Sequence, residues 1–395
     1  MSELSYLEKL LDGVEWVTLG SMADIGTGSS NRQDESENGI YPFYVRSKNI
    51  LKSDTFEFDE VAIVIPGEGG IGDIFHYVEG KYALHQRAYR IRITTNAVDT
   101  KFLYYFMSSS FKQYILTKSV GATAISIRKP MLEGFKVPIP SPDNPEKSLA
   151  IQSEIVRILD KFTALTAELT AELNMRKKQY NYYRDQLLSF KEGEINWTTL
   201  GNEELFHICA GGTPSKSKAE YWDNGSIPWL KSESCNNESV YFAKDFISEL
   251  GLKKSTAKLL PKNTTLIALV GATIFKTAFL EFEATTNQNI ASIKSTKENI
   301  ITDKFIFYFL TNLYNTLKSE MRNYGMLNLT NLRQFRIPIP CIAEQKRIVS
   351  ILDKFDTLTN SITEGLPREI ELRQKQYEYY RDLLFSFPKP ETVSN

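Results

Sequence analysis

Two glycine-containing segments of the chain have the spacing of loops that bind phosphate groups. The first is GEGGIG (67–72), a GxGxxG pattern directly after the strand-like run VAIVIP (61–66). A dinucleotide site also needs a helix that opens at the third glycine. The residues that follow, DIFHYVEGKYALHQRAY, favour strand, turn and strand instead. We therefore predict a glycine-rich hairpin loop here, with a cofactor loop as the weaker alternative.

The second segment, GATIFKT (271–277), ends like a phosphate loop but has Phe275 where the second glycine is required. The backbone cradle for a phosphate would not form around that side chain. Asp143 with Glu146 and Lys147 has the residue types of a metal-dependent nuclease, but these residues are crowded inside a proline-rich linker. The Asn-Pro-Pro-aromatic motif of amino methylation does not occur in the sequence. An enzyme is therefore the weaker hypothesis, and we expect no catalytic residue in this chain.

Metal and thiol chemistry are not favoured either. Cys209, Cys235 and Cys341 are far apart, they form no CxxC pair, and the chain has only three histidines. We therefore expect no metal site and no cofactor bound to this chain. Scattered thiols suit a reducing cytosol, the N-terminal SELSYLEKLLDG is unlike a signal peptide, and no apolar run approaches the roughly 18 residues of a membrane span. We expect a cytoplasmic protein without membrane contact.

Loops rich in glycine, serine or asparagine carry the residue types that read DNA. Arg and Lys bind phosphate or guanine, and Asn and Gln pair with adenine. The net charge of −1 indicates no global basic field, so a DNA surface has to come from local patches. In the first half of the chain, the predicted DNA contacts are Arg32, Arg46, Lys48, Asn49, Gln86, Arg87, Arg128 and Lys129. In the second half, they are Lys216, Lys218, Lys231, Ser232, Lys276, Asn287, Gln288 and Asn289. The alternative for each residue is a solvated loop charge.

These candidates belong to two similar units, because the chain repeats itself once with a period of about 195 residues. RKKQYNYYRDQLLSF (176–190) recurs as RQKQYEYYRDLLFSF (373–387), with eleven of fifteen positions identical. Three shorter blocks also recur: VRILDKF (156–162) as VSILDKF, FKVPIP (135–140) as FRIPIP, and EWVTLG (15–20) as NWTTLG. Gln86 and Gln288 occupy matching places. If the two units read different DNA, shared residues should serve scaffold or phosphate, and differing residues should read bases.

Each unit has a mixed part and a helical part. The mixed parts contain short strand-like runs, and helical stretches at 99–116 and 303–321, between Gly, Pro and Asn residues. We predict an α+β fold with two pseudo-symmetric mixed α/β domains, called head 1 and head 2, separated by two long helices that form an antiparallel coiled coil. The predicted boundaries are an N-terminal helix at 1–13 near the C-terminal repeat, head 1 at 14–147, a central helix at 148–194, head 2 at 195–342, a second long helix at 343–388 and a tail at 389–395.

Apolar residues in both helical parts recur at alternating four and three, the heptad rhythm of a coiled coil. In the central helix the stripe is Ile151, Ile155, Ile158, Phe162, Leu165, Leu169, Leu173, Tyr180, Tyr183 and Leu187. In the second it is Ile348, Ile351, Phe355, Leu358, Ile362, Ile370, Tyr377, Tyr380 and Leu384. TAELTAEL (166–173) inserts a stutter, and Gly365 with Pro367 should break or kink the second helix. The alternative for both stripes is core packing within one bundle.

A helix over residues 150–190 is roughly 60 Å long, at 1.5 Å per residue. Readers of DNA half-sites are separated by about 34–36 Å per helical turn, so such a helix can hold two heads on one duplex. Adding one TAEL unit lengthens it by about 6 Å and rotates it about 40° past a full turn. We therefore predict that adding or removing one unit changes the half-site spacing by about one or two base pairs.

With these blocks, the chain resembles the specificity subunit of type I restriction–modification enzymes over its whole length. SYLEKLLDGVEW, the segment from PDNPEKSLAIQ to RDQLLSF, and the region from ILDKFDTL onward look like the type IC group. The heads match more generally, in GGTPSKSKAEYW, IPWLKS and ATTNQNIASI, which look like target-recognition domains.

The resemblance implies a DNA-specificity subunit without catalytic activity, which reads a bipartite asymmetric site in double-stranded DNA. It implies two methyltransferase subunits, docked through the coiled coil, and two restriction and translocase subunits as partners. S-adenosylmethionine, ATP and Mg are then expected on those partners. Two rival hypotheses are a freestanding tandem DNA-binding regulator and a coiled-coil adaptor without a DNA role.

Overall fold

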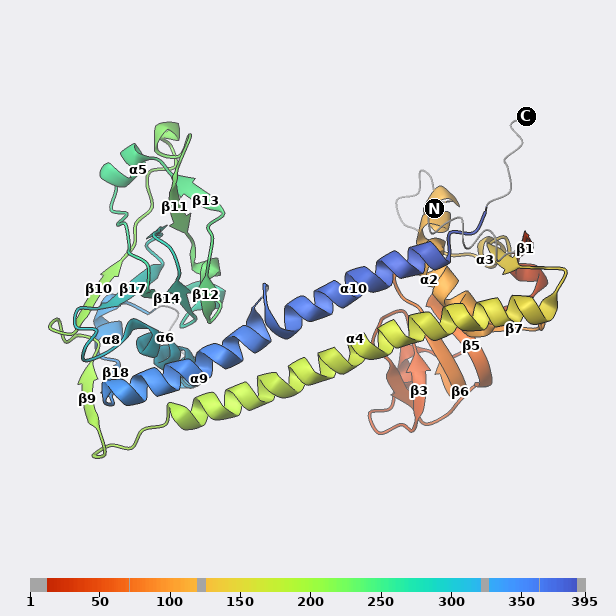
Figure 1. Cartoon of the computed structure of the whole chain (residues 1–395), viewed down its shortest axis with the longest axis horizontal. Coiled ribbons are helices and arrows are strands. Elements are labelled where there is room, and N and C mark those ends of the chain that lie inside the picture. The colour runs from red at the N-terminus through yellow and green to blue at the C-terminus, as the bar shows by residue number, and fades with distance from the viewer. Residues whose placement is uncertain (1–12, 71, 119–125, 321–326, 362, 389–395) are drawn as a thin grey trace. The chain divides into compact units, whose positions relative to one another are not determined.

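The computed structural model describes residues 13–70, 72–118, 126–320, 327–361 and 363–388. The chain divides into two compact units, residues 1–168 with 370–395, and residues 169–369 (Figure 1). The expected tail and all of the expected N-terminal helix except Gly13 lie outside the described residues, as does Ile362. No helix in the described part of the chain is long and apolar enough to span a bilayer.

Head 1, in the first unit, is built on a six-stranded sheet. Its strands are, in spatial order, β2 (Ala23–Thr27), β7 (Ala88–Ile93), β5 (Phe58–Pro66), β6 (His76–Leu84), β3 (Tyr41–Tyr44) and β4 (Leu51–Ser53). Neighbouring strands are antiparallel except β3 and β6. Central β5 is buried from Ala62 to Pro66, which explains its continuous apolar run. A separate ribbon pairs β1 (Val14–Thr18) with β8 (Lys136–Pro140).

The core of head 1 lies between this sheet and α2 (Thr100–Lys118). Phe102 and Phe106 of α2 are buried with Ile63 of β5, and Phe385 and Phe387 from the C-terminal segment complete the same cluster. The smaller elements are α3 (Lys129–Glu133), η1 (Leu19–Ser21) and η2 (Arg32–Asp34). The C-terminal segment of the chain therefore belongs to the core of head 1.

Head 2 carries the same scaffold with additions. A five-stranded sheet has the order β10 (Phe206–Ala210), β17 (Ile290–Ser295), β14 (Thr264–Ala268), β15 (Thr277–Leu280) and β12 (Glu238–Val240). A three-stranded sheet holds β13 (Asp245–Ile247), β11 (Ile227–Leu230) and β16 (Thr285–Thr286), and a ribbon pairs β9 (Asn196–Thr199) with β18 (Arg336–Ile339). The helices are α5 (Glu249–Lys253), α6 (Asp303–Asn312), α7 (Tyr314–Glu320) and α8 (Leu329–Arg333), with η3 (Ala219–Tyr221), η4 (Ser232–Ser234) and η5 (Gly271–Thr273). The stretch predicted as one helix at 303–321 is thus two helices that meet at Leu313.

Strand register aligns the two heads residue by residue. Tyr44 pairs in parallel with Leu84 in head 1, as Leu230 pairs with Thr286 in head 2. The antiparallel pair β5–β6 has the same register as the pair β14–β15. The antiparallel pair β5–β7 likewise has the same register as the pair β14–β17. Residues 62–91 of head 1 therefore match residues 264–293 of head 2 one for one.

The long helices are α4 (Pro145–Leu187), α9 (Ile342–Asn360) and α10 (Gly365–Leu384). The predicted break in the second helical part is confirmed, because α9 ends at Asn360 and α10 begins at Gly365, which has a left-handed φ of +76°. Pro367 lies in the first turn of α10, where no intrahelical donor is lost. Helix α4 continues through the TAEL repeat, and the division between the units falls inside that repeat.

Each unit contains an antiparallel pair of helical segments, one from each repeat. In the first unit, α4 leaves head 1 and α10 returns to it, and the rings of Phe162 and Tyr380 stack with centroids 5.3 Å apart. In the second unit, α9 leaves head 2 and the end of α4 enters it, and Phe355 stacks on Tyr183 at 5.7 Å. The predicted fold class, with mixed α/β heads and antiparallel long helices, is confirmed.

The same side chains anchor the helices to both heads. Fully buried Gln152 of α4 accepts from the backbone N–H of Asp99 at 2.8 Å, and Gln345 of α9 accepts from that of Thr302 at 2.9 Å. The hydroxyl of Tyr105 donates to Asp160 at 2.6 Å in the first unit. Tyr308 donates to Asp353 at the same distance in the second. Each helix start is therefore fixed to its own head by matching polar contacts.

Candidate nucleic-acid interface

Two of the predicted DNA-binding arginines of head 1 meet at one acid. Arg46 follows β3, Arg87 lies in the turn between β6 and β7, and both guanidinium groups pair with the carboxylate of Glu68, at 3.2 and 3.1 Å. Glu68 lies just after β5, in the loop that the GxGxxG pattern occupies. All three side chains are about half exposed. Exposed ion pairs contribute about 0–1 kcal/mol, so a phosphate or a base edge can take either arginine from the acid at little cost.

Gln86 lies beside these arginines and ties two strand ends together. Its Nε2 donates to Oδ1 of Asn31 at 2.5 Å, and Asn31 directly precedes Arg32. The end of β2 can lie this close to the end of β6 because Gly28 has no side chain. A Cβ at Gly28 would stand 1.9 Å from the carbonyl oxygen of Leu84. The predicted residues Arg32, Gln86 and Arg87 are therefore brought to one end of the sheet.

Arg128 is carried to the same place by a backbone contact. The N–H of Ile127 donates to the carbonyl of Gly67 at 2.8 Å, which sets Arg128 beside the loop that contains Glu68. Arg128 is exposed at the start of α3. We call residues 30–32, 45–47, 67–68, 85–87 and 126–128 the head 1 loop cluster.

Head 2 builds the corresponding cluster on the same backbone contacts. The N–H of Leu269 donates to the carbonyl of Asn289, and the N–H of Leu327 donates to the carbonyl of Leu269, both at 2.8 Å. The hydroxyl of Thr213 donates to Oε1 of Gln288. We call residues 212–213, 231–232, 269–270, 287–289 and 327–328 the head 2 loop cluster. Of the predicted residues, Lys231, Ser232, Asn287, Gln288 and Asn289 fall inside it.

At matching positions of the two loop clusters, the glutamine is the same in both heads and the residues around it differ. Gln86 and Gln288 match, and each forms a hydrogen bond with a residue in the connection after the first strand of its sheet, Asn31 after β2 and Thr213 after β10. Arg87 matches Asn289, and Glu68 matches Val270. Arg128 and Asn328 follow residues that make the same backbone hydrogen bond. The two heads therefore present different donors and acceptors from one shared scaffold.

The other predicted contacts lie around the clusters or away from them. Lys48 and Asn49 are exposed in the connection from β3 to β4, and Lys129 pairs with Glu133 at 3.8 Å. Exposed Lys216 and Lys218 lie before η3, and Lys218 donates to the hydroxyl of Tyr221 at 3.1 Å. Lys231 pairs with Asp245 at 2.8 Å over the ring of Trp229. Lys276 lies outside the head 2 loop cluster, in the hairpin between β14 and β15. Burial raises the pKa of Glu238 on β12, and the charge of Lys276 opposes this rise.

The hairpin prediction for the GxGxxG segment is confirmed. β5 and β6 pair in antiparallel around it, and Gly69, Gly70 and Gly72 have left-handed φ angles of 69°, 57° and 74°. No helix begins at Gly72. In GATIFKT the connection also joins two antiparallel strands, and Phe275 adopts a φ of 66°. Neither segment has the strand-to-helix geometry of a phosphate loop.

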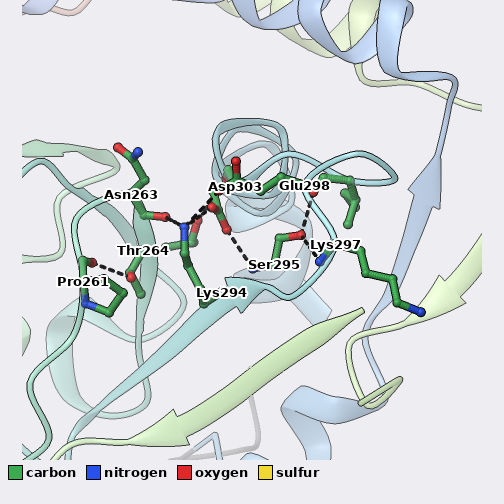
Figure 2. Close-up of polar contacts among 10 residues, drawn as sticks. Pro261, Asn263, Thr264, Lys294, Ser295, Lys297, Glu298 and Asp303 are labelled. Atoms are coloured by element: carbon green, nitrogen blue, oxygen red, sulfur yellow. Dashed lines mark hydrogen bonds and ion pairs between the residues drawn. The ribbon is translucent and has the colours of Figure 1, made fainter. Parts of the chain in front are cut away.

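The strand that carries the head 2 cluster is held firmly at its other end. β17 begins after Asn289 and ends at Ser295, whose backbone N–H donates to Asp303 at 2.7 Å. Lys294 also pairs with Asp303, and donates to the carbonyl of Asn263 at 3.2 Å (Figure 2). Burial raises the pKa of Asp303 to about 6. This buried pair fixes β17 against the start of α6.

Comparison with known proteins decides the family. Residues 12–176 and 194–372 each match the type I restriction modification DNA specificity domain. The chain belongs to this family. The matched segments cover both loop clusters, and the resemblance stated from the sequence is confirmed.

Three type I specificity subunits are similar to the chain over nearly their whole length. The chain is 45% identical to the EcoR124I/EcoR124II specificity subunit of Escherichia coli, over 100% of both chains. It is 34% identical to the EcoprrI specificity subunit of E. coli, over 92% of this chain and 93% of the relative. It is 31% identical to a putative specificity subunit of Haemophilus influenzae, over 97% and 98%.

Solved structures of this family share the fold. A type I restriction–modification S subunit from M. genitalium is similar with a TM-score of 0.60 at 17% identity, over 96% of this chain and 97% of that chain. A chain from a structure of the type I R-M system has a TM-score of 0.56 at 16% identity, over 95% and 98%. At these identities the likeness concerns the fold alone.

The sequence analysis did not identify the side chains that accept hydrogen bonds and ion pairs within the head 1 loop cluster. Glu68 holds two arginines, and Asn31 holds Gln86. His85 is buried, and its Nδ1 accepts from the backbone N–H of Arg87 at 3.0 Å. Burial, and then the charges of Arg46 and Arg87, lower the pKa of His85, so the ring stays neutral at pH 7. An acid or a lone histidine in a loop gives no pattern in one sequence, so only the fold reveals these roles.

Proposed function

We propose that this specificity subunit reads a bipartite, asymmetric site in double-stranded DNA, with one half read by each head. The observation that carries the proposal is the exchange of side chains on matching backbone positions. Arg87 in head 1 offers donors for guanine, whereas Asn289 in head 2 offers a donor and an acceptor for adenine. Arg128 in head 1 and Asn328 in head 2 also occupy matching positions, again with an arginine in head 1 and an asparagine in head 2. Two readers with one scaffold and different reading residues suit two different half-sites.

Within each loop cluster, the shared glutamine has a positioning role. Gln86 and Gln288 are bonded to Asn31 and Thr213, and these contacts link the first strand of each sheet to the reading turn. Such contacts fix register and orientation without carrying sequence information. The charge pairs Arg46–Glu68 and Lys231–Asp245 keep cations in place before DNA arrives. Phosphate replaces the carboxylates when the duplex binds.

The long helices set the spacing between the half-sites and dock the partner subunits. Each unit pairs a helical segment of one repeat with a segment of the other, through Phe162 with Tyr380 and through Phe355 with Tyr183. Two equivalent helix pairs suit two copies of a methyltransferase subunit, with two restriction and translocase subunits added to the complex. Methylation with S-adenosylmethionine and cleavage with ATP and Mg then reside in those partners, and this chain contributes specificity without catalysis.

Methylome sequencing tests this function directly. Cells that carry the chain with its methyltransferase partner should methylate one asymmetric two-part motif with a fixed gap, and cells without the chain should lack it. Symmetric or single-part motifs would contradict the two-reader proposal. A freestanding regulator is the alternative, and it differs in binding its site tightly as a purified chain with no partner added.

A further inference from the structure

The connection after the parallel strand differs in length between the two heads. In head 1, β3 and β4 are joined by residues 45–50, whereas β11 and β13 in head 2 are joined by residues 231–244. The longer connection contains β12, which pairs in parallel with β15 at 278–280. Among the described residues of head 1, no strand takes this place on the matching segment of β6, residues 76–78.

A hollow lies along this part of β6, entirely within the first unit. It has a volume of about 380 Å³, and its lining includes His76 and Tyr77 of β6, Tyr44 of β3, Lys101 of α2 and Asp160 of α4. Ligand pockets measure about 300–1,000 Å³, so this one takes a few side chains rather than a domain. Its walls combine aromatic rings with one cation and one acid.

The residues that surround β12 in head 2 have counterparts around the hollow. Lys304 matches Lys101, and it donates to the hydroxyl of Ser239 on β12 at 3.1 Å. Ser239 pairs with Phe279, which matches Tyr77. Asp353 matches Asp160. The hydroxyl of Tyr105 on α2 donates to Asp160, and the hydroxyl of the matching Tyr308 on α6 donates to Asp353. The hollow of head 1 thus stands where head 2 places its own strand.

A comparison of Lys304 in head 2 with Lys101 in head 1 shows how a strand at this position changes the contacts of the lysine. In head 2, the Lys304 ammonium lies 3.9 Å from Asp353, because it is shared with Ser239 and Glu281 of the β12 region. In head 1, the Lys101 ammonium lies 2.7 Å from Asp160 and also faces the Tyr77 ring at 5.6 Å. Lys101 can turn toward a hydroxyl or carbonyl that enters the hollow, as Lys304 does.

We propose that the hollow of head 1 is the docking site of an extended segment of a partner protein, which joins the sheet as a strand parallel to β6. The occupant is a strand like β12, with a small hydroxyl residue that meets Lys101. Strand addition to a free sheet edge uses main-chain hydrogen bonds for affinity and side-chain pockets for specificity.

The partner is a methyltransferase subunit, a choice that rests on the proposed function. The subunit that modifies the DNA has to lie beside the head that reads it. In head 2 the same edge is occupied by β12, so only head 1 accepts the added strand. The inference therefore predicts an asymmetry between two otherwise equivalent partner copies.

Hydrogen exchange followed by mass spectrometry tests the proposal on the full-length chain, with residues 277–280 of β15 as internal control. In the free chain, the amides of residues 76–81 should exchange faster than those of β15. When the methyltransferase subunit is added, exchange at 76–81 should slow about tenfold or more, while β15 stays unchanged. Full protection in the free chain, or no added protection in a complex whose mass shows assembly, overturns the proposal. Failure to assemble at all counts against the proposed function instead.

A peptide probe tests the chemistry of the hollow without any partner. The synthetic peptide NNESVYFA, the sequence of residues 236–243, should bind the full-length chain and protect residues 76–81. Lys101→Met should weaken this binding about tenfold, since the charge-assisted hydrogen bond is lost. Lys112→Met is the matched control, because Lys112 pairs with Asp73 outside the hollow. Equal binding by both variants, or by a scrambled peptide, overturns the proposed strand site.

Discussion

Arg90 in head 1 and Ser292 in head 2 occupy one register position on the strand next to the centre of each sheet. Arg90 pairs with Asp24 at 2.7 Å and with Glu60 at 3.2 Å, and it faces Gly26 across the ladder. Ser292 faces Cys209 and donates to its carbonyl at 3.2 Å. The two heads therefore share a backbone while the residue pairs at this position of the sheet have changed together. A scaffold that tolerates such exchange within its sheet can also tolerate it in the loop clusters.

The largest expected effect concerns this buried pair. Arg90→Leu should lower the free energy of unfolding of head 1 by about 3–5 kcal/mol, because Glu60, whose side chain is 15% exposed, loses its closer cation and keeps only the more exposed Arg92 at 3.5 Å. Urea unfolding of the full chain measures the loss. Arg92→Leu is the control on the same strand. Arg92 lies near the same two acids, 3.7 Å from Asp24 and 3.5 Å from Glu60, but its side chain is 47% exposed, so the expected loss is under about 1 kcal/mol. Equal losses would show that the Arg90 pair is no special feature of head 1.

The second prediction concerns a feature that the heads share. Gln152→Ala and Gln345→Ala should each cost about 1–3 kcal/mol, because each leaves buried backbone groups without a partner. Thermal and urea unfolding of the two variants should give similar losses, and Gln374→Ala, at an exposed helix position, should give nearly none. A large effect in one head only would break the symmetry of the anchors.

The third prediction concerns the residues that differ. Arg87→Asn should weaken binding of the assembled complex to its site by about 1–3 kcal/mol and relax one base position in the half read by head 1. Competition binding with oligonucleotides that vary one base at a time measures this preference. Arg92→Ala, an exposed arginine of the same head outside the loop cluster, is the control. Uniform weakening over all sequences would assign Arg87 to phosphate instead.

The last prediction is a pH dependence of stability that arises in head 2. The pKa of Asp303 is about 6 in the folded chain and about 3.9 when unfolded, so the folded state holds the proton more tightly. The contribution is full below about pH 4 and is lost as pH rises through about 6. Unfolding of Asp303→Asn from pH 4 to 7 should lack this slope. At the start of α2, exposed Asp99 caps the helix instead, and Asp99→Asn should leave the slope in place.

The repeat made the architecture predictable, but not the packing of each helix. Identical blocks indicated two heads and two helical parts, and Gly365 indicated the break. The heptad pattern predicted Ile158 as a packing position of the coiled coil. The neighbouring Leu159, which is fully buried, is the residue that lies in the core of head 1. The start of α4 packs on a head and on another helix, so one heptad stripe cannot describe both contacts.

The positions of several residues in the two loop clusters were predictable from the sequence, but the contacts among those residues were not. Gln86 and Gln288 matched in the sequence, and both lie in loop clusters. Lys276 was predicted with Gln288, but it lies in the hairpin between β14 and β15, outside the head 2 loop cluster, and its role stays a prediction. Among the residues of head 1 that the structure describes, no strand corresponds to β12, so the repeat gave no signal for it.

Insertion of one TAEL unit after Leu173 tests the central claim most directly, with methylome sequencing as the measurement. Two independent readers at a distance set by the helices predict the same bases in both halves of the motif and a gap changed by about one or two base pairs. An unchanged gap, or altered bases in either half, would contradict the account.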